Sequence, residues 1–467
     1  LRRQRQMCIR DRSNAVGMVS YIGRLNYDYK GIYLLELLGR RDGSSRLHPD
    51  YRWANFGGAS AAVRLSELDF VKQINIFDNL KLRASYGETG STTGIGNYDY
   101  ISGISNGTIF TGLESQPAST VTSWISSMTS LERTWERVST LNFGLDFAVL
   151  NNRLNGTFDY FVRKNNDMLI GITYPQILGA DAPKTNSGDF TANGWELALN
   201  WNDKIGPVGY KVGFSLSDAR TEVTRMEGAT AIKVGKNSTI EGKPLNAIYV
   251  YRTDGILQNE DEVRQYYNKY GFKSDTDMAL KPGTKLPDYL STNRLTPGCV
   301  RRVDMNDDGK INTDDLDYYG DSAPHFLFGL NLGLEWNNFD FNAFFQGVGK
   351  QYMVREGDFG VCPLGAVYQN QNRTYLDNTW TPERTDAKLP LMSANNSRKA
   401  WNYKEYNDIN IQNISYCRLK NISLGYTLPK SALRKIGMEH VRLYISGDDL
   451  FVISNVRDGL DPVSYTH

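Results

Sequence analysis

The chain has 467 residues and a formal net charge of +1, with 53 Lys and Arg residues against 52 Asp and Glu residues. This near balance of charges excludes the excess of basic residues that is typical of a nucleic-acid-binding protein. Mean hydropathy is −0.47, and no run of eighteen or more apolar residues occurs, which excludes helical membrane spans. A membrane-spanning β-barrel is still allowed, because its strands are apolar on one face only.

Both ends of the chain resemble translated sequencing adapter. Met7-Cys8-Ile9-Arg10-Asp11 can be written ATG TGT ATA AGA GAC, whose reverse complement GTC TCT TAT ACA CAT encodes Val463–His467. One DNA element in two orientations therefore explains both ends. We expect residues 1–12 and 463–467 to be artefacts that must be left out of fold reasoning, and we expect the natural gene to continue beyond residues 13–462.

Apolar and polar residues alternate with a period of two along much of the remaining chain. Leu141, Phe143, Leu145 and Phe147, for example, are separated by Asn142, Gly144 and Asp146. This pattern is typical of strands with one apolar face. It predicts twelve strands, near residues 18–28, 32–40, 53–66, 79–88, 138–150, 153–164, 192–203, 208–218, 326–337, 339–347, 411–428 and 440–447.

The connections between these segments differ greatly in length. Tight turns at 151–152, 203–207 and 337–338 alternate with long excursions at 89–137, 165–191, 219–325 and 348–410. Short turns on one side and long extracellular loops on the other are typical of an outer-membrane barrel. We therefore predict an all-β fold, an antiparallel transmembrane β-barrel that is incomplete. Plugged transporter barrels have about 22 strands, so twelve would be roughly half or more of one.

Aromatic residues near the predicted strand ends agree with this interpretation. Trp195, Trp201, Trp336, Phe339 and Tyr426 occupy positions where barrels carry girdles of amphipathic rings. The alternative is a soluble β-sandwich with these rings in its core. The opposite strand faces are rich in Asn, Ser, Gly, Lys and Asp, which a wet or plugged lumen accepts and lipid does not.

One segment of the longest excursion has the spacing of a calcium-binding loop. Oxygen-bearing side chains recur between residues 304 and 315 around Gly309, which occupies the sixth position, where an EF-hand loop needs its sharp turn. The backbone carbonyl of the seventh residue would contribute as well. The predicted ligands are Asp304, Asn306, Asp308, Lys310, Asn312 and Asp315. We expect a structural calcium ion; the alternative is a solvated acidic loop that binds no ion.

Other chemical motifs are missing from the sequence. The cysteines beyond the adapter-like end, Cys299, Cys362 and Cys417, have no metal-ligand spacing, and the histidines are scattered. No nucleophile elbow, phosphate loop or dinucleotide fingerprint occurs, so we predict no enzyme. Aromatic residues in the long excursions allow stacking on sugars, but packing between the loops is the favoured interpretation; they include Tyr266, Tyr267, Tyr270, Trp380 and Trp401.

Several stretches together resemble the SusC/RagA family of TonB-linked outer-membrane proteins. They are Arg40-Arg41-Asp42-Gly43-Ser44-Ser45-Arg46, Leu80–Gly90, Asn142–Phe147 with Phe158-Asp159-Tyr160, Phe344-Phe345-Gln346-Gly347, Arg418–Pro429 and Asp449-Leu450-Phe451. Asp449 stands where the family usually has Asn. Each motif is weak alone, but their order and spacing cover nearly all of residues 13–462.

The resemblance implies a multi-pass barrel in the cell outer membrane, surrounded by outer-membrane lipid and plugged by an N-terminal domain. It further implies a SusD-like surface lipoprotein partner, energy from the TonB system, and import of glycans or oligopeptides. Plug, TonB box and closing strand are expected to lie outside this chain. Members of the family often carry an Asp-rich motif just before a barrel strand, and Phe326–Trp336 follows the motif here. The alternative is a surface β-protein that does not transport, either a porin or an adhesin-like protein.

Overall fold

The computed structural model describes residues 15–101, 104–111, 118–125, 128–171, 184–228, 233, 235–270, 295–355, 377–393, 395–404, 406–429, 437–456 and 461–462. Both adapter-like ends, residues 1–12 and 463–467, lie outside the described residues. Within the described ranges, no helix is both long and apolar enough to cross a membrane.

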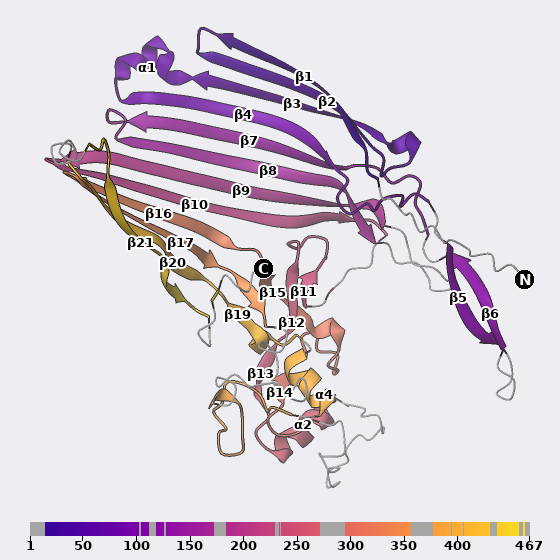
Figure 1. Ribbon diagram of the computed structural model, residues 1–467. Coiled ribbons are helices and arrows are strands. Elements are labelled where there is room, and N and C mark those ends of the chain that lie inside the picture. The colour runs from indigo at the N-terminus through magenta and orange to yellow at the C-terminus, as the bar shows by residue number, and fades with distance from the viewer. Residues whose placement is uncertain are drawn as a thin grey trace, which may run out of the picture. The chain divides into compact units, whose positions relative to one another are not determined.

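Twelve strands form one antiparallel sheet in the order β1-β2-β3-β4-β7-β8-β9-β10-β16-β17-β20-β21 (Figure 1). The strands are β1 (Met18–Tyr29), β2 (Tyr33–Ser44), β3 (Trp53–Arg64), β4 (Phe77–Ser91), β7 (Glu136–Val149), β8 (Leu154–Gly171), β9 (Lys184–Ile205), β10 (Val208–Met226), β16 (His325–Trp336), β17 (Phe339–Lys350), β20 (Tyr416–Thr427) and β21 (Arg442–Ser454). All twelve predicted strands are therefore confirmed, and their order in the sheet is their order in the chain.

The predicted strand limits need two corrections. Strands β8, β9, β10 and β21 run well beyond their predicted limits, to Gly171, from Lys184, to Met226 and to Ser454. The extension of β8 packs Leu169 against the cluster that contains Trp135, and the extension of β10 buries Val223 completely, so neither keeps the alternation of an exposed apolar face and a polar face. The predicted strand 411–428 is two strands, β19 (Ile411–Asn413) and β20, because β19 pairs with β18 (Tyr352–Val354) instead of joining the large sheet.

The connections alternate between short and long, as predicted. One end of the strands, which we call the short-turn end, carries the turns at 30–32, 150–153, 206–207 and 337–338. It also carries the somewhat longer connections 65–76, which contains α1 (Asp69–Ile74), and 428–441. The connections at the other, long-loop end include 92–135, 227–324 and 351–415. Among the connections that the structure describes in full, the one at 45–52 is short at that end. The hairpin of β5 (Ile104–Thr111) and β6 (Ala118–Ile125) belongs to the first of the long ones.

The chain divides into two compact units, each described here by itself: residues 1–146, 159–193 and 223–230, and residues 147–158, 194–222 and 231–467. In the first unit, the strand register keeps apolar residues on one face. One row across four strands is Leu25, Leu37, Ala59 and Tyr86. The row beside it on the opposite face is Asn26, Glu36, Ser60 and Ser85.

The second unit repeats this separation of faces. One row across β10, β16, β17, β20 and β21 is Tyr210, Leu334, Phe341, Leu424 and Ile445. The neighbouring row on the opposite face is Lys211, Gly333, Asn342, Ser423 and Ser446. Such strict alternation fits a wall with lipid on one side and water on the other.

Aromatic rings gather at the short-turn end of each unit. In the second unit, Phe339 lies between Trp336 and Tyr426, with ring centroids 6.3 and 4.6 Å apart. In the first unit, Tyr29 and Tyr33 lie 6.4 Å apart across the β1–β2 turn. Trp201 donates a hydrogen bond of 3.1 Å to the Tyr210 hydroxyl, so its polar edge is satisfied. These placements are those of an interfacial girdle.

The long connections of the second unit fold into a structure of their own, which we call the loop layer: the described residues of 235–321 and 351–415. It contains β11 (Gly235–Ser238), β12 (Ala247–Tyr251), β13 (Thr253–Ile256), α2 (Glu260–Tyr270), β14 (Val300–Arg302), β15 (Leu316–Asp321), β18, α4 (Asn396–Lys399) and β19. Strand β12 is buried on both faces, with Tyr249 and Tyr251 against Leu316, and Ile248 and Val250 against another cluster. A strand buried on both faces reads as a continuous apolar run without alternation, which is why the periodicity missed it.

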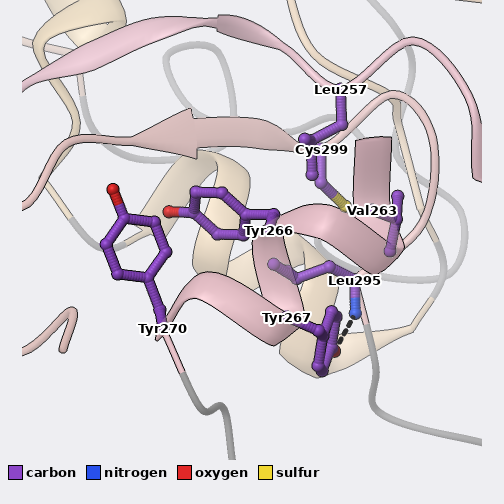
Figure 2. Close-up of a cluster of buried hydrophobic side chains, with 7 residues drawn as sticks. All are labelled: Leu257, Val263, Tyr266, Tyr267, Tyr270, Leu295 and Cys299. Atoms are coloured by element: carbon purple, nitrogen blue, oxygen red, sulfur yellow. Dashed lines mark hydrogen bonds between the residues drawn. The ribbon is translucent and has the colours of Figure 1, made fainter. Parts of the chain in front are cut away.

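Helix α2 supplies the largest core of the loop layer, shown in Figure 2. Tyr266, Tyr267 and Tyr270 are all buried, together with Leu257, Val263, Leu295 and Cys299. The backbone N–H of Leu295 donates to the Tyr267 hydroxyl at 2.7 Å. Burial raises the pKa of the Cys299 thiol, which keeps it protonated and unreactive. The tyrosines therefore pack the loops together, as the sequence interpretation favoured over sugar stacking.

A buried arginine ties this core to the rest of the loop layer. The guanidinium carbon of Arg302 lies 4.0 Å from the ring centroid of Tyr251 and 3.8 Å from that of Trp401. Its Nε donates to Asn407 Oδ1 at 2.8 Å, and its Nη2 donates to the Trp401 carbonyl at 2.9 Å. The Tyr266 hydroxyl donates to the Arg302 carbonyl at 2.8 Å. A planar fork between two rings is a geometry that only arginine satisfies.

We predict that Arg302→Lys destabilises the loop layer by about 1.5–3 kcal/mol, because lysine keeps the charge but loses the fork and the two ring contacts. Hydrogen exchange on the full-length protein should speed up in residues 247–256 and 396–404. Arg301→Lys is the matched control, since the Arg301 side chain is 37% exposed. Equal exchange in the two variants would show that the ring sandwich adds nothing.

Candidate functional site

The predicted calcium loop connects β14 to β15. The chain must turn sharply between Asp304 and Lys310, and it does so through two residues with positive φ, Asp307 at 57° and Gly309 at 78°. The backbone N–H of Gly309 donates to Asp304 Oδ2 at 2.9 Å. Gly309 therefore adopts the left-handed conformation that the sixth position of such a loop requires.

Oxygens of short Asn and Asp side chains accept hydrogen bonds from the backbone in the rest of the turn. Asn306 Oδ1 accepts a hydrogen bond from the Asp308 N–H at 3.0 Å, and Asp308 Oδ1 accepts one from the Lys310 N–H at 2.8 Å. Asn312 Oδ1 accepts one from the Asp314 N–H at 2.6 Å. Each oxygen has a further lone pair, so these contacts orient the predicted ligands without using them up.

Asp315 closes the loop from its far end. Its side chain is fully buried, and its two oxygens accept hydrogen bonds from the N–H groups of Met305, at 2.9 Å, and Asn312, at 2.8 Å. With Asn312 it forms a capping box at the start of the short helix Thr313–Asp315. Asp315, the last residue of the loop, is thus tied to the second residue, Met305, and to the ninth, Asn312.

One atom in the loop is left without a partner. Asp304 Oδ1 is buried and has no hydrogen bond within the described part of the chain. A buried carboxylate oxygen without a partner is costly, and a bound cation would remove that cost. The same residues contain no group of three or more His, Cys, Asp or Glu side chains close enough to hold a metal. Asp304, Asp308 and Asp315, the three carboxylates among the predicted ligands, therefore do not form such a group in this structure.

Two lysines that the sequence did not single out lie near the loop. Lys233 Nζ donates to the Asp314 carbonyl at 3.2 Å. A hydrogen bond to Tyr270 raises the pKa of Lys269, and the charges of Asp304 and Asp307 raise it further. The loop's negative field thus reaches α2. Both lysines are far from the loop in sequence, so no local pattern indicates them.

His325 lies where the loop layer joins the large sheet. Its ring is buried between Asp218 of β10, at 2.7 Å from Nδ1, and Asp321 at the end of β15, at 3.1 Å from Nε2. The histidine therefore joins three elements of the second unit, β10, β15 and β16. This contact is a structural role for His325.

A network in the first unit explains three of the sequence motifs. Arg83 of β4 makes a two-bond contact with Asp146 of β7, at 2.9 Å for each bond, and a third bond to Asp159 of β8, at 3.0 Å. A β-carbon on Gly144 would lie 2.5 Å from Arg83 Cζ, so the glycine leaves room for the guanidinium. These residues lie on the polar face, where a paired charge costs little.

Known proteins resemble the chain along nearly all of its length. No family model matches. The TonB-dependent receptor P3 of Formosa agariphila is 28% identical over 453 residues, which are 96% of this chain and 42% of that protein. The TonB-dependent receptor SusC of Bacteroides thetaiotaomicron is 25% identical over 465 residues, 95% of this chain and 41% of that protein. The chain therefore spans less than half the length of these relatives.

Solved structures agree on the fold. The structure of the RagAB peptide transporter has a TM-score of 0.70 and 23% identity, and the match covers 96% of this chain and 45% of that one. The RagAB peptide importer in its open-open state has a TM-score of 0.71 at 22% identity. These relatives are receptors and transporters rather than enzymes. In sequence the chain is similar to TonB-dependent receptors, SusC among them, and in fold it is similar to the RagAB structures.

Proposed function

We propose that the full-length receptor imports glycans or oligopeptides across the outer membrane with energy from the TonB system. The observation that carries the proposal is the likeness to TonB-dependent receptors over 96% of the chain. The strand faces support it, because a wall that is apolar on one side and polar on the other encloses a path for a hydrophilic solute.

The polar face offers contacts suited to such a solute. Charges there are paired, as Arg83 is with Asp146 and Asp159, or Lys211 with Glu335 at 2.6 Å. Neutral amides such as Asn331 and Asn342 lie among glycines. Paired charges and amides offer hydrogen bonds without fixing a strong net field, so both neutral glycans and peptides fit.

A SusD-like surface lipoprotein is the proposed partner at the long-loop end. The likeness to SusC and to the RagAB structures supports this. The loop layer would present a preformed surface to such a partner, since its tyrosines, Arg302 and short strands pack into cores of their own. Preformed surfaces lose little entropy on binding.

We predict that deleting the tonB gene of the host abolishes uptake of the receptor's substrate, and that deleting the receptor gene does the same. Uptake would be measured with labelled oligosaccharides and labelled oligopeptides in parallel, so that the substrate class emerges from the same experiment. A strain with the gene restored is the control. Uptake that needs the receptor but persists without TonB would mean a passive channel, and the import proposal would be wrong.

We also propose that the loop 304–315 binds calcium through Asp304, Asn306, Asp308, the Lys310 carbonyl, Asn312 and Asp315. The buried, unpartnered Asp304 Oδ1 supports this, together with the turn at Gly309. Calcium is favoured over magnesium because a site made only of protein oxygens suits the larger ion. The bound ion would stabilise the connection between β14 and β15.

We predict that Asp304→Asn and Asp308→Asn each weaken calcium binding at least about tenfold, because ligand charge sets the affinity of such loops. Calorimetry on the full-length receptor in detergent measures this. The control is Asp307→Asn, an identical change at a neighbour that is not a predicted ligand and whose positive φ suits Asn. No calcium binding by the unaltered protein, or equal affinities in all variants, would contradict the proposal.

A further inference from the structure

An arginine and two aromatic rings form a compact group on the apolar face of the first unit, at the long-loop end. The guanidinium carbon of Arg41 on β2 lies 5.3 Å from the ring centroid of Trp53 on β3. The Trp53 ring stacks on Tyr21 of β1, with centroids 6.1 Å apart and planes 21° apart. Tyr21 and Arg41 are direct cross-strand partners.

The position of the Trp53 ring is built into the sheet. Trp53 pairs with Gly43 across the β2–β3 ladder. A β-carbon on Gly43 would lie 2.8 Å from the indole ring, so the ring lies against this glycine, where no side chain can fit. Gly43, the glycine of the Arg40–Arg46 motif, thus leaves the space that the Trp53 ring occupies. The Trp53 ring in turn positions the guanidinium of Arg41.

This group marks one edge of the lipid-facing band. The other edge is at the short-turn end, where Lys30 Nζ lies 5.3 Å from the ring centroid of Tyr29 and the Tyr29 ring lies 6.4 Å from that of Tyr33. Arg41 is eight residues from Tyr33 along β2. That is roughly 26 Å of strand, or roughly 20 Å along the membrane normal at the usual tilt of barrel strands, which is most of the apolar band of about 25 Å. On β2, the exposed residues between the two edges are Leu35, Leu37 and Gly39.

Arg41 has no charge partner in the described ranges. It is exposed, and it makes no hydrogen bond or ion pair there. The nearby Arg40 pairs with Asp42 at 2.8 Å, and Glu88 and Arg137 pair with each other at 3.7 Å. A cation at the edge of the bilayer is tolerated, but its natural counter-ion at that depth is the headgroup of a lipid.

We propose that Arg41, Trp53 and Tyr21 form a binding site for the phosphate of a lipid headgroup in the leaflet at the long-loop end. The guanidinium binds the phosphate, and the two rings lie at the level of the headgroup and cover the upper part of the acyl chains. In an outer membrane, the long loops face the outside, so the lipid is a phosphorylated lipid of the outer leaflet. The site is independent of the transported substrate, since it lies on the face opposite the polar one.

Native mass spectrometry of the full-length receptor tests this with two probes, phosphatidic acid and the diacylglycerol with the same acyl chains. The unaltered protein should prefer phosphatidic acid, and Arg41→Gln should reduce that preference about fivefold, the effect of one interfacial cation. Arg24→Gln, the same change on the opposite face of β1, should leave it unchanged. Arg41→Lys should keep most of it, which distinguishes lost charge from a folding defect.

An unchanged preference in Arg41→Gln would overturn the proposal, as would a loss of equal size in Arg24→Gln. Inorganic phosphate, added at millimolar concentration, separates the two sources of the anion. If it displaces phosphatidic acid completely from the site, the group binds free phosphate and the lipid proposal is wrong. If phosphatidic acid remains bound, the acyl chains and rings contribute as proposed.

Discussion

Hydrogen bonding of the backbone inside a lipid bilayer is the constraint on which the rest of this structure depends. Lipid offers no partner to an N–H or C=O group, so every strand in it must pair with neighbours on both sides. Ten of the twelve strands of the large sheet meet this requirement in the simplest way, by pairing with the sheet strands before and after them in the chain, while β1 and β21 pair on one side only within the described residues. Register then decides which side chains meet the lipid. Leu37 pairs with Leu25 and Ala59, and a slip of one residue would place Glu36 there instead.

Glycines solve the crowding that this arrangement produces. A flat sheet brings bulky side chains of adjacent strands into contact, and two sites show how room is made. Gly144 leaves space on the polar face for the guanidinium of Arg83, which joins three strands through Asp146 and Asp159. Gly43 leaves space on the apolar face for Trp53. Both glycines belong to motifs that carry the family resemblance. In each case the motif places a glycine where a large side chain of a neighbouring strand needs the space.

The sequence predicted the wall of the barrel far better than the loop layer. Alternation reports a strand with two different environments, and all twelve wall strands have them. Strand β12 is buried on both faces and has no alternation to detect. Helix α2 did have a usable signal: Asn259 and Glu262 cap its start reciprocally, acidic residues fill its first turn, and Lys269 stands in its last.

The candidate metal loop, like the fold, could be predicted from the sequence only in part. Its turn, with Gly309 in the left-handed conformation, follows from local spacing and was predicted. The contacts that place it, from Arg302, Lys233 and the α2 tyrosines, come from distant parts of the chain and leave no local pattern. Calcium binding itself stays a prediction, because only the loop's own geometry bears on it.

The length of the connection between β10 and β16 explains why the loop layer needs cores of its own. A connection of this length without structure would be unusual in a compact protein, and closing it costs entropy. The chain offsets that cost by giving the segment cores of its own, one around α2 and two on either side of β12. His325 then joins it to the wall through Asp218. In this layer, the turn at 304–315 is held largely by hydrogen bonds between its own residues, with Asp315 buried. Ile311 of this turn packs against both the core around α2 and the core that contains Leu316, so a cation bound at the turn would act where two cores of the layer meet.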